Sequence, residues 1–442
     1  MADGPLTAAI EHLLKGIRDC SAHVAVIGLG YVGLPMGLEF ARAGFRVSGL
    51  DADLERCASL QAGHSYIEDL TDADLQAAQA TGRFRVTAST AVLAEADVIM
   101  ICVPTPLRKS KDPDLTAILS ATSTLAQHLR PGQLVILEST TYPGTTEEVL
   151  LPMLSDKGMQ VGRDFFLAFS PERVDPGNTE FGVRKITKLV GACTPLGTRI
   201  AVEFYGKVIE TVAPVSSTRV AEAAKLLENT FRSVNIALAN EMSIICKHLG
   251  VDVWEVIDAA ATKPFGFMAH FPGPGIGGHC IPLDPHYLSW KARLHGYEPR
   301  FISLATEINA GMPRHVVEMI AAALNDRSQC LRGSRVLVLG VAYKANVSDS
   351  RESPALEILK SLASRGVQVS YSDPFVPSVN VGGLTLHHEE LTAEVLRDTD
   401  CAVIVTDHAA FDYGLIVAEA PLVVDTRNAT RRAGVRGNVQ FL

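Results

Sequence analysis

The sequence lacks several features that would decide its class at once. Its eight cysteines include no C-x-x-C pair, which argues against a disulfide framework or a structural zinc site and indicates reduced thiols. No apolar run is long enough to span a bilayer, so no membrane insertion is expected. There is no block of Lys or Arg, and 49 acidic against 40 basic residues give a net charge of −9, which argues against nucleic acid as the main partner. The histidines show no metal-ligand spacing, so we predict no metal.

The N-terminal segment also lacks the pattern of a secretory signal. Residues 1–20 have no basic start, apolar block and small-residue cleavage site, and they fit a short amphipathic helix instead. We therefore expect a cytoplasmic protein. A chain of 442 residues is too long for one ordinary core, which predicts two or three domains.

What the sequence does contain is two series of apolar runs that alternate with helical patterns. This alternation is typical of a parallel sheet covered by helices. Strands are expected at 23–30, 45–51, 96–106, 133–140 and 165–172, and again at 335–340, 367–373, 401–407 and 421–428. Between the series, residues 216–250 have apolar residues at helical spacing and no proline, which predicts one long helix. We predict an α/β fold of two Rossmann-like doubly wound domains joined by a central long-helix region.

A glycine-rich turn follows the first expected strand. The run from Gly28 to Gly33 reads G-L-G-Y-V-G, in which two glycines let the backbone turn and approach a pyrophosphate and the third lets helix and strand pack closely. Asp51 ends the second strand, where a carboxylate binds the adenosine ribose and repels the extra phosphate of NADP. We therefore predict NAD as the cofactor. Arg56 is either a further ribose contact or an ordinary solvated arginine.

Two polar residues of the expected long helix lie four positions apart. Lys225 and Asn229 therefore share a face, where an ammonium and an amide could stabilise one oxyanion. On their own they fit an exposed Lys and Asn of an amphipathic helix equally well.

The segment 273–285 surrounds one cysteine with four glycines and three prolines. Glycine permits close approach to a ligand and proline restricts the loop, so Cys280 is expected to be displayed for chemistry. A displayed thiol can attack an aldehyde to give a thiohemiacetal, which a second hydride transfer converts to a thioester. Asp284 is near enough to orient the hydrolytic water, and His279 is left without a role. The other cysteines mostly lie in strand or helix runs typical of buried positions.

Taken together, these motifs resemble the UDP-glucose and GDP-mannose dehydrogenase superfamily. The shared order is G-x-G-Y-V-G, V-P-T-P, E-S-T, S-P-E, K-x-x-x-N, G-G-x-C-x-x-x-D and K-x-x-x-x-D-x-R-E-S-P. Residues 170–178 and the Pro-Gly-Pro-Gly run before Cys280 resemble most the UDP-N-acetylglucosamine 6-dehydrogenase branch. The resemblance implies an NAD-binding Rossmann domain at 1–212, a central helical dimerisation and catalytic-loop domain at 213–318, and a UDP-binding Rossmann-like domain at 319–442. It also implies a homodimer or higher homo-oligomer.

The resemblance implies six catalytic residues: Cys280, Lys225, Asn229, Glu172, Asp284 and Thr140. In that order they are the nucleophile, two oxyanion-stabilising groups, the acid/base group of the thioester stage and two groups that position water and neighbouring side chains. The cofactor-binding positions are Gly28, Gly30, Tyr31, Val32, Gly33, Asp51, Arg56, Val103, Pro104, Thr105, Pro106, Ser139, Thr140 and Arg351. The substrate-binding positions are Glu172, Arg173, Lys225, Asn229, Phe271, Gly273, Gly275, Gly277, Tyr343, Lys344 and Arg427, whose cations suit two phosphates.

The activity implied is a four-electron oxidation of the C6 hydroxymethyl of a UDP-N-acetylhexosamine, with UDP-N-acetylglucosamine the preferred substrate. Arg173 and Val174 stand where UDP-glucose enzymes usually carry Phe-Leu after the matching Pro-Glu. Together with the later Asp-Pro-Gly-Asn run at 175–178, they favour a bulkier C2 substituent. UDP-glucose, UDP-N-acetylmannosamine and UDP-N-acetylgalactosamine stay open as alternatives. A two-electron hydroxyacid-type dehydrogenase would have no use for Cys280, and the intact catalytic set argues against a silent nucleotide-sugar sensor.

Overall fold

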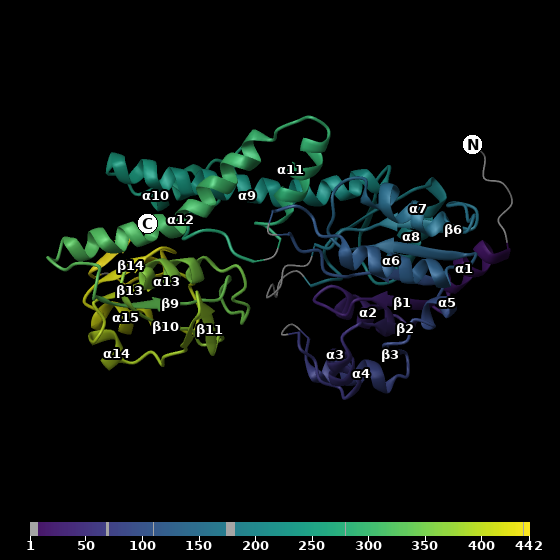
Figure 1. Ribbon diagram of the computed structural model, residues 1–442, viewed down its shortest axis with the longest axis horizontal. Helices are drawn as coiled ribbons and strands as arrows, with labels where there is room; N and C mark the ends of the chain where they lie inside the picture. Colours follow the sequence, from purple (N-terminus) through teal and green to yellow (C-terminus); the bar gives the residue numbers. More distant parts are fainter. Residues whose placement is uncertain (1–7, 68–69, 109, 174–181, 279, 436) are drawn as a thin grey trace. The chain divides into compact units, whose positions relative to one another are not determined.

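The structure, a computed structural model, describes residues 8–67, 70–108, 110–173, 182–278, 280–435 and 437–442 (Figure 1). It divides into two compact units. The first comprises Met1–Glu228 and His286–Tyr297, and the second comprises Asn229–Pro285 and Glu298–Leu442. The point of division falls within helix α9 (Thr218–Leu249), so this helix contributes to both units.

The first unit is built on an eight-stranded sheet of order β3-β2-β1-β4-β5-β6-β7-β8. Every strand pair is parallel except β6 with β7. The strands are β1 (His23–Ile27), β2 (Arg46–Leu50), β3 (Phe84–Thr87), β4 (Val98–Ile101), β5 (Gln133–Leu137), β6 (Phe165–Phe169), β7 (Lys188–Ala192) and β8 (Val212–Pro214). Because the strand order reverses between β1 and β4, a ligand crevice is expected at the carboxyl ends of these two strands.

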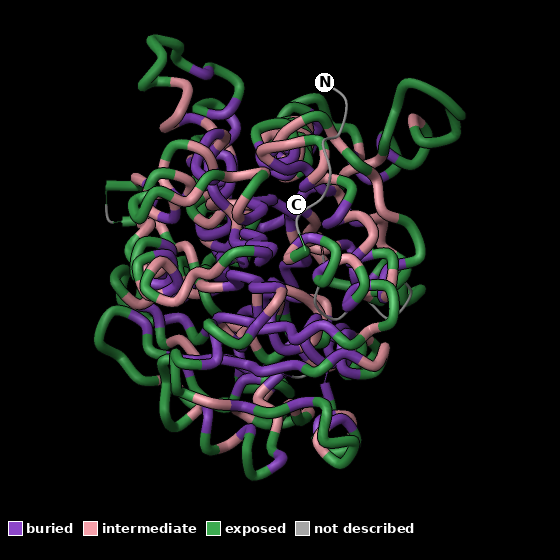
Figure 2. Tube along the Cα trace, turned by 90° about the vertical axis from the view of Figure 1, so that its right-hand side faces the viewer, coloured by how far each residue is buried: buried purple, intermediate pink, exposed green. Residues whose placement is uncertain are grey.

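Both faces of this sheet are covered, as the sequence of β1 requires. Val24 and Val26 join one apolar core while Ala25 and Ile27 join another, because successive side chains of a strand point to opposite faces. Figure 2 shows buried residues through the interior and exposed ones along the outer loops. The helical elements of this unit are α1 (Ala8–Arg18), α2 (Gly33–Arg42), α3 (Leu54–Gln61), α4 (Asp72–Ala80), α5 (Val92–Glu95), α6 (Thr116–His128), the π-helix η1 (Thr146–Leu150), α7 (Leu151–Ser155), α8 (Pro195–Tyr205) and most of α11 (Asp284–Leu294).

The second unit contains a smaller parallel sheet of order β10-β9-β13-β14-β15 and a separate antiparallel hairpin. The strands are β9 (Arg335–Leu339), β10 (Gln368–Ser372), β13 (Cys401–Ile404), β14 (Val423–Asp425) and β15 (Val439–Phe441), with β11 (Ser378–Val381) and β12 (Leu384–His387) in the hairpin. The helices are α10 (Val253–Ala261), α12 (Arg300–Asn325), α13 (Pro354–Ser364), α14 (Ala393–Arg397), α15 (Tyr413–Glu419) and α16 (Ala429–Arg432).

This architecture confirms the predicted α/β fold with two Rossmann-like sheets and a central helical region. The long helix expected at 216–250 is α9, and the amphipathic N-terminal helix is α1, which buries Ile10, Leu13 and Ile17. Sequence patterns did not single out β3, β7, β8, β11, β12 and β15. No helix among the described residues is both long and apolar enough to cross a membrane.

Candidate active site

The turn between β1 and α2 has the shape that a pyrophosphate needs. Gly28 has φ +92°, and a Cβ there would lie 2.6 Å from the carbonyl oxygen of Cys102. A Cβ on Gly33 would lie 1.9 Å from the Gly28 oxygen, whereas one on Gly30 would meet nothing within 4 Å. The first and third glycines are therefore fixed by packing, and the middle one leaves room for a ligand. No side chain caps the N-terminus of α2, so its amides can receive a phosphate.

Asp51 stands directly beside this turn. Its carboxylate accepts hydrogen bonds from the amides of Leu29 (2.9 Å) and Asp53 (3.0 Å) and from the Arg56 guanidinium (3.2 Å). A carboxylate offers about four acceptor positions, so capacity remains for a ribose diol. Arg56 is thus held by an ion pair with Asp51, and its guanidinium also lies 5.1 Å from the ring centre of Tyr66. An ordinary solvated arginine would lack these two contacts.

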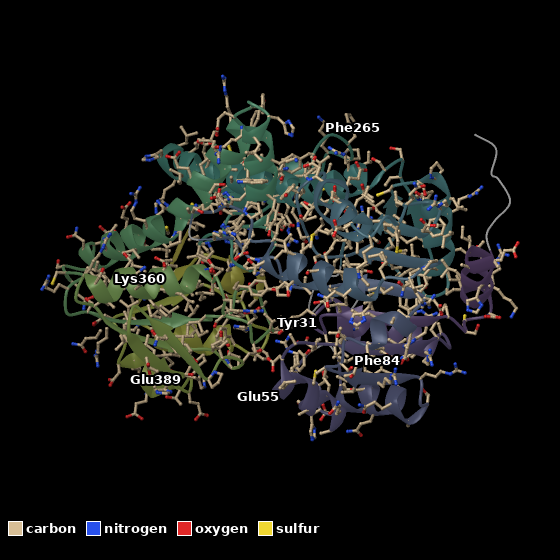
Figure 3. The ribbon with its side chains drawn as sticks, turned by 45° about the vertical axis from the view of Figure 1, so that its right-hand side comes forward. Tyr31, Glu55, Phe84, Phe265, Lys360 and Glu389 are labelled. Carbon is tan, nitrogen blue, oxygen red and sulfur yellow. The ribbon has the colours of Figure 1, made fainter. Side chains whose placement is uncertain are left out.

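The carboxyl ends of β4 and β5 carry the other predicted cofactor positions of the first unit. The Ser139 hydroxyl donates to the carbonyl of Val103 (2.8 Å), which joins the two strand ends. The Tyr287 hydroxyl donates to the carbonyl of Thr105 (2.7 Å) and so fixes the V-P-T-P segment at 103–106. Thr140 follows Ser139 and is half-buried. Tyr31, labelled in Figure 3, is 42% exposed.

The corresponding aspartate of the second sheet is used differently. Asp373 follows β10 and accepts from the amides of Val341 (2.7 Å) and Ala342 (2.9 Å), while buried His408 contacts the same oxygen at 3.0 Å. Burial alone would raise the pKa of Asp373, but these hydrogen bonds hold it below its ordinary value. The side chains of Asp373 and His408 are both fully buried. The second sheet therefore repeats the Rossmann turn, but His408 occupies the side of the Asp373 carboxylate that a ribose would need.

Lys225 and Asn229 are not exposed helix residues. Lys225 lies in the part of α9 that belongs to the first unit and is only 8% exposed. Asn229 is half-buried in the second unit, and its amide nitrogen donates to the carboxylate of Asp284. The interpretation as an ordinary solvated pair is therefore wrong for both.

Cys280 lies at the start of a tight turn that leads into α11. Its carbonyl accepts from the amides of Leu283 (3.2 Å) and Asp284 (2.9 Å), and the residue is exposed. Asp284, buried at the first position of α11, connects this turn to α9 through Asn229. Exposure alone does not distinguish the thiol, because Cys330 is exposed as well.

The glycine-rich loop before Cys280 packs directly on the predicted uridine diphosphate residues of the second unit. A Cβ on Gly273 would lie 2.9 Å from the Arg427 guanidinium, and one on Gly277 would lie 2.8 Å from the Cβ of Tyr343. At Gly275 φ is +131°, a conformation that favours glycine. The loop, Tyr343 and Arg427 therefore lie together in one cluster.

A buried amide pair holds the same loop against α9. The Asn240 oxygen accepts from the Gly273 amide (2.9 Å), and its nitrogen donates to the Asn309 oxygen (2.9 Å). Asn309 in turn donates to the carbonyl of Ser233 (3.1 Å). At the start of the loop, half-exposed Phe271 stacks on Trp254 with ring centres 5.8 Å apart.

Glu172 follows β6 in the first unit, and its side chain is 13% exposed. One carboxylate oxygen accepts from the Arg173 amide (2.7 Å), and the other lies 3.5 Å from the Lys188 ammonium. The Arg173 side chain pairs with Glu228 and donates to the carbonyl of Thr187 (2.8 Å). Residues 174–178 of the predicted hexosamine motif, and His279, lie outside the described residues.

Two predicted positions lie on the segment after β9. Arg351 makes a bidentate pair with Asp349 at 2.9 and 2.7 Å, and Lys344 is half-buried. The catalytic prediction is therefore distributed over both units. Thr140, Glu172 and Lys225 belong to the first, and the other three belong to the second.

Comparison with known proteins gives a family for this arrangement. The chain matches the NAD binding domain of the UDP-glucose/GDP-mannose dehydrogenase family over residues 22–209, the central domain over 219–311 and the UDP binding domain over 337–432. A UDP-N-acetyl-D-glucosamine 6-dehydrogenase of Pseudomonas aeruginosa is 37% identical over 399 residues, covering 90% of this chain and 90% of that protein. The chain belongs to this family.

A further relative and a solved structure carry a different sugar in their names. A UDP-N-acetyl-D-mannosamine dehydrogenase of Pyrococcus horikoshii is 35% identical over 389 residues, 88% of this chain and 90% of that protein. A solved structure of UDP-D-ManNAc dehydrogenase from Pyrococcus horikoshii has a TM-score of 0.86 at 33% identity and covers 95% of this chain and 98% of that one.

As a member of the UDP-glucose/GDP-mannose dehydrogenase family, the present chain is an NAD-dependent nucleotide-sugar dehydrogenase. This rules out the hydroxyacid-type alternative.

Sequence reasoning missed the buried polar groups that support these residues. They are Glu138, Lys188, Tyr205, Glu222, Asn240 and Asn309. The available signal was a charge inside an apolar run, as in the K-L-V-G-A of β7, since a lysine is almost never fully buried unless it is paired.

Proposed function

We propose that this enzyme oxidises the C6 hydroxymethyl of a UDP-N-acetylhexosamine to the carboxylate, with UDP-N-acetylglucosamine as the preferred substrate. The observation that carries the proposal is the exposed Cys280, held at a turn that Asp284 connects to Asn229 of α9. A two-electron alcohol dehydrogenase has no need of such a thiol.

The covalent route assigned to Cys280 balances in four steps. The alcohol loses a hydride and a proton to give the aldehyde, and the Cys280 sulfur then adds to the carbonyl carbon to form a thiohemiacetal. Loss of a second hydride and proton gives the thioester, which water cleaves to release the acid and the thiol. Bound NAD would supply the hydride acceptor for each of the two oxidations.

The remaining catalytic groups act on charge and on water. Lys225 and Asn229 stabilise the oxyanions of the alcohol and adduct stages, which their burial favours because interactions with charge are stronger away from water. Glu172 takes the proton of the hydrolytic water, and Asp284 and Thr140 position that water and its neighbours.

The binding roles follow the three parts of the chain. Residues 1–212 hold NAD through the open position at Gly30 and the carboxylate of Asp51, and residues 319–442 hold the uridine diphosphate together with the loop before Cys280. The phosphate partners in this second set are Lys344 and Arg427. Residues 213–318 supply the catalytic loop and the dimer contact.

The 2-acetamido group is inferred from Arg173 and the residues that follow it. A second candidate is UDP-N-acetylmannosamine, because relatives of similar identity carry that name. UDP-glucose is the third. The test is NADH formation with UDP-N-acetylglucosamine, UDP-N-acetylmannosamine, UDP-N-acetylgalactosamine and UDP-glucose, compared by kcat/KM. We expect the highest value for UDP-N-acetylglucosamine, and a value as high for UDP-glucose as for every acetamido sugar contradicts the proposal.

We also propose that the enzyme is a homodimer joined along α9. Six large apolar residues of this helix are exposed, at spacings of 7, 4, 7, 7 and 4 along the chain: Val220, Leu227, Phe231, Leu238, Ile245 and Leu249. Such spacing places them on one face of the helix, and an apolar stripe of this length on a surface is typical of a protein interface. A second copy of the chain is the partner that the family resemblance implies.

A further inference from the structure

Among the described residues of the first unit, Lys188 is a buried cation that the catalytic scheme above does not use. It is the first residue of β7, and its side chain is 6% exposed. Its ammonium lies 2.9 Å from a carboxylate oxygen of Glu138 and 3.5 Å from an oxygen of Glu172. The second oxygen of Glu138 accepts from the hydroxyl of fully buried Tyr205. A chain of polar contacts thus runs from Tyr205 through Glu138 and Lys188 to Glu172.

The topology puts these groups at the edge of the sheet where ligands bind. Glu138 follows β5 and Glu172 follows β6, two parallel strands whose carboxyl ends share one edge. Because β7 runs antiparallel to β6, its first residue reaches that same edge. Exposure of the side chains rises along the chain of contacts, from 0% at Glu138 through 6% at Lys188 to 13% at Glu172.

We propose that Lys188, anchored by Glu138 and Tyr205, is a positioning residue that fixes the orientation of the Glu172 carboxylate for thioester hydrolysis. The inference rests on the role proposed above for Glu172. The two oxygens of Glu172 are held separately, one by the Arg173 amide and the other by Lys188. A general base takes a proton only from a water that its oxygen faces, so the orientation of the carboxylate bears directly on the rate of hydrolysis.

The electrostatics of the cluster support this assignment. Burial alone would lower the pKa of Lys188, but the carboxylates of Glu138 and Glu172 hold it above its ordinary value, so the lysine keeps its charge. Burial raises the pKa of the Glu138 carboxyl, and Lys188 opposes that effect. The ionisable groups around the ammonium are those two glutamates, Tyr205 and the Cys102 thiol, whose pKa burial raises well above its ordinary range.

The test is kcat and KM for acid formation in Lys188→Met, Lys188→Arg and the control Lys185→Met, which removes an exposed lysine three residues away. Without the ammonium that holds one oxygen of Glu172, kcat of Lys188→Met should fall about tenfold, with KM for the UDP-sugar unchanged. Lys188→Arg should restore most of the wild-type kcat, and Lys185→Met should keep it. An unchanged kcat in folded Lys188→Met would overturn the proposal.

Two further variants keep the experiment decisive. If Lys188→Met does not fold, the double variant Glu138→Gln/Lys188→Met avoids an unpaired carboxylate at fully buried Glu138 and retains an acceptor for Tyr205. It should show the same loss of kcat with unchanged KM. Adding Lys188→Met to Glu172→Gln should cause no further loss of kcat, because both act through one group, and a full additional loss contradicts the inference. Wild-type acid formation by Glu172→Gln alone would instead overturn the proposed role of Glu172.

Discussion

At the scale of single residues, we expect Asp51 to determine which dinucleotide this enzyme accepts. Its carboxylate is held by the Leu29 amide and by Arg56, so a 2′-phosphate at the ribose would approach a fixed negative charge. In the second sheet, the corresponding carboxylate of Asp373 is already paired with His408. Only the carboxylate of the first sheet is therefore available to a ribose.

We predict that wild-type enzyme uses NAD with at least about 100-fold higher kcat/KM than NADP, a difference of about 2.7 kcal/mol. Asp51→Asn keeps an acceptor for the Leu29 amide but removes the charge, so it should narrow that preference about tenfold or more. Asp53→Asn, which changes the neighbouring exposed carboxylate that caps α3, is the control and should leave the preference intact. Comparable efficiency of wild-type enzyme with NAD and NADP would show that the assignment of Asp51 is wrong.

The residue scale is also where sequence reading worked best and where it stopped. Gly28, Asp51 and Cys280 lie in local motifs whose spacing predicts their geometry. In the structure, Gly28 lies in a tight turn, Asp51 follows a strand and Cys280 is exposed, as predicted. Lys188 and Asn240 carry no such signal, because their partners lie 50 and 33 positions away along the chain. These contacts form only when the first sheet has assembled around Lys188 and when α9 has packed against α12 around Asn240.

At the scale of elements, α9 fixes two loops through buried polar side chains. In the second unit, Asn240 binds the Gly273 amide and Asn309 and so holds the loop before Cys280. In the first unit, Glu222 accepts from the amides of Gly144 (2.5 Å) and Thr146 (2.9 Å) at the start of η1.

Removing the Asn240 side chain should therefore loosen the substrate loop. Asn240→Ala leaves a buried amide and a buried side chain without their partner, which costs on the order of 1–3 kcal/mol for each group left unpaired. We expect a lower melting temperature and a KM for the UDP-sugar raised about tenfold, with NAD affinity unchanged. The matched control is Asn235→Ala on the same helix, whose side chain bonds only the carbonyl of Phe231 among the described contacts. If both variants behave alike, the buried amide pair does not hold the loop.

Glu222 predicts a pH dependence of stability. Burial raises its pKa from 4.5 to about 7, although the hydrogen bonds from Gly144 and Thr146 act in the opposite direction. The folded state therefore binds more protons than the unfolded state between these values, so the contribution of Glu222 to stability falls as pH rises from 4.5 to 7. A shift of this size corresponds to about 3 kcal/mol.

Glu222→Gln should remove that dependence. The melting temperature of the variant relative to wild type should rise between pH 5 and pH 8, as measured by thermal unfolding. The control is Glu147→Gln, whose melting temperature relative to wild type should stay constant in this range. Burial alone would raise the pKa of Glu147, but hydrogen bonds from Arg219 and Thr218 lower it, so this carboxylate stays ionised from pH 5 to pH 8. A relative melting temperature of Glu222→Gln that falls with pH contradicts the account.

At the scale of the whole molecule, the predicted dimer follows from the apolar face of α9. Phe265, labelled in Figure 3, is 71% exposed after α10 and adds to the apolar surface of the second unit. The sequence predicted the helix and its length but not which of its residues stay uncovered, since that depends on how the chain packs around it.

Placing a charge on this face should separate the dimer. Leu238→Lys with Ile245→Lys is expected to sediment as a monomer at micromolar concentration, whereas wild type sediments as a dimer, because a lysine buried without a partner is costly. Leu294→Lys, which changes an exposed leucine of α11, is the control and should remain dimeric. Wild-type protein that sediments as a stable monomer would rule out the interface.

The central claim for the whole enzyme is that one active centre carries out both oxidations through Cys280. An aldehyde becomes a good hydride donor once a nucleophile has added to it, and the sulfur both adds readily and leaves later from the thioester. Truncation of an exposed thiol leaves no core cavity, so Cys280→Ala should keep the fold and NAD binding.

The most direct measurement is NADH formed per sugar consumed, with the product identified by mass, for wild type and Cys280→Ala side by side. We expect two NADH and the uronic acid from wild type, and no uronic acid from Cys280→Ala. A single NADH per sugar in wild type, or uronic acid at a near-normal rate from the alanine variant, would contradict the covalent mechanism.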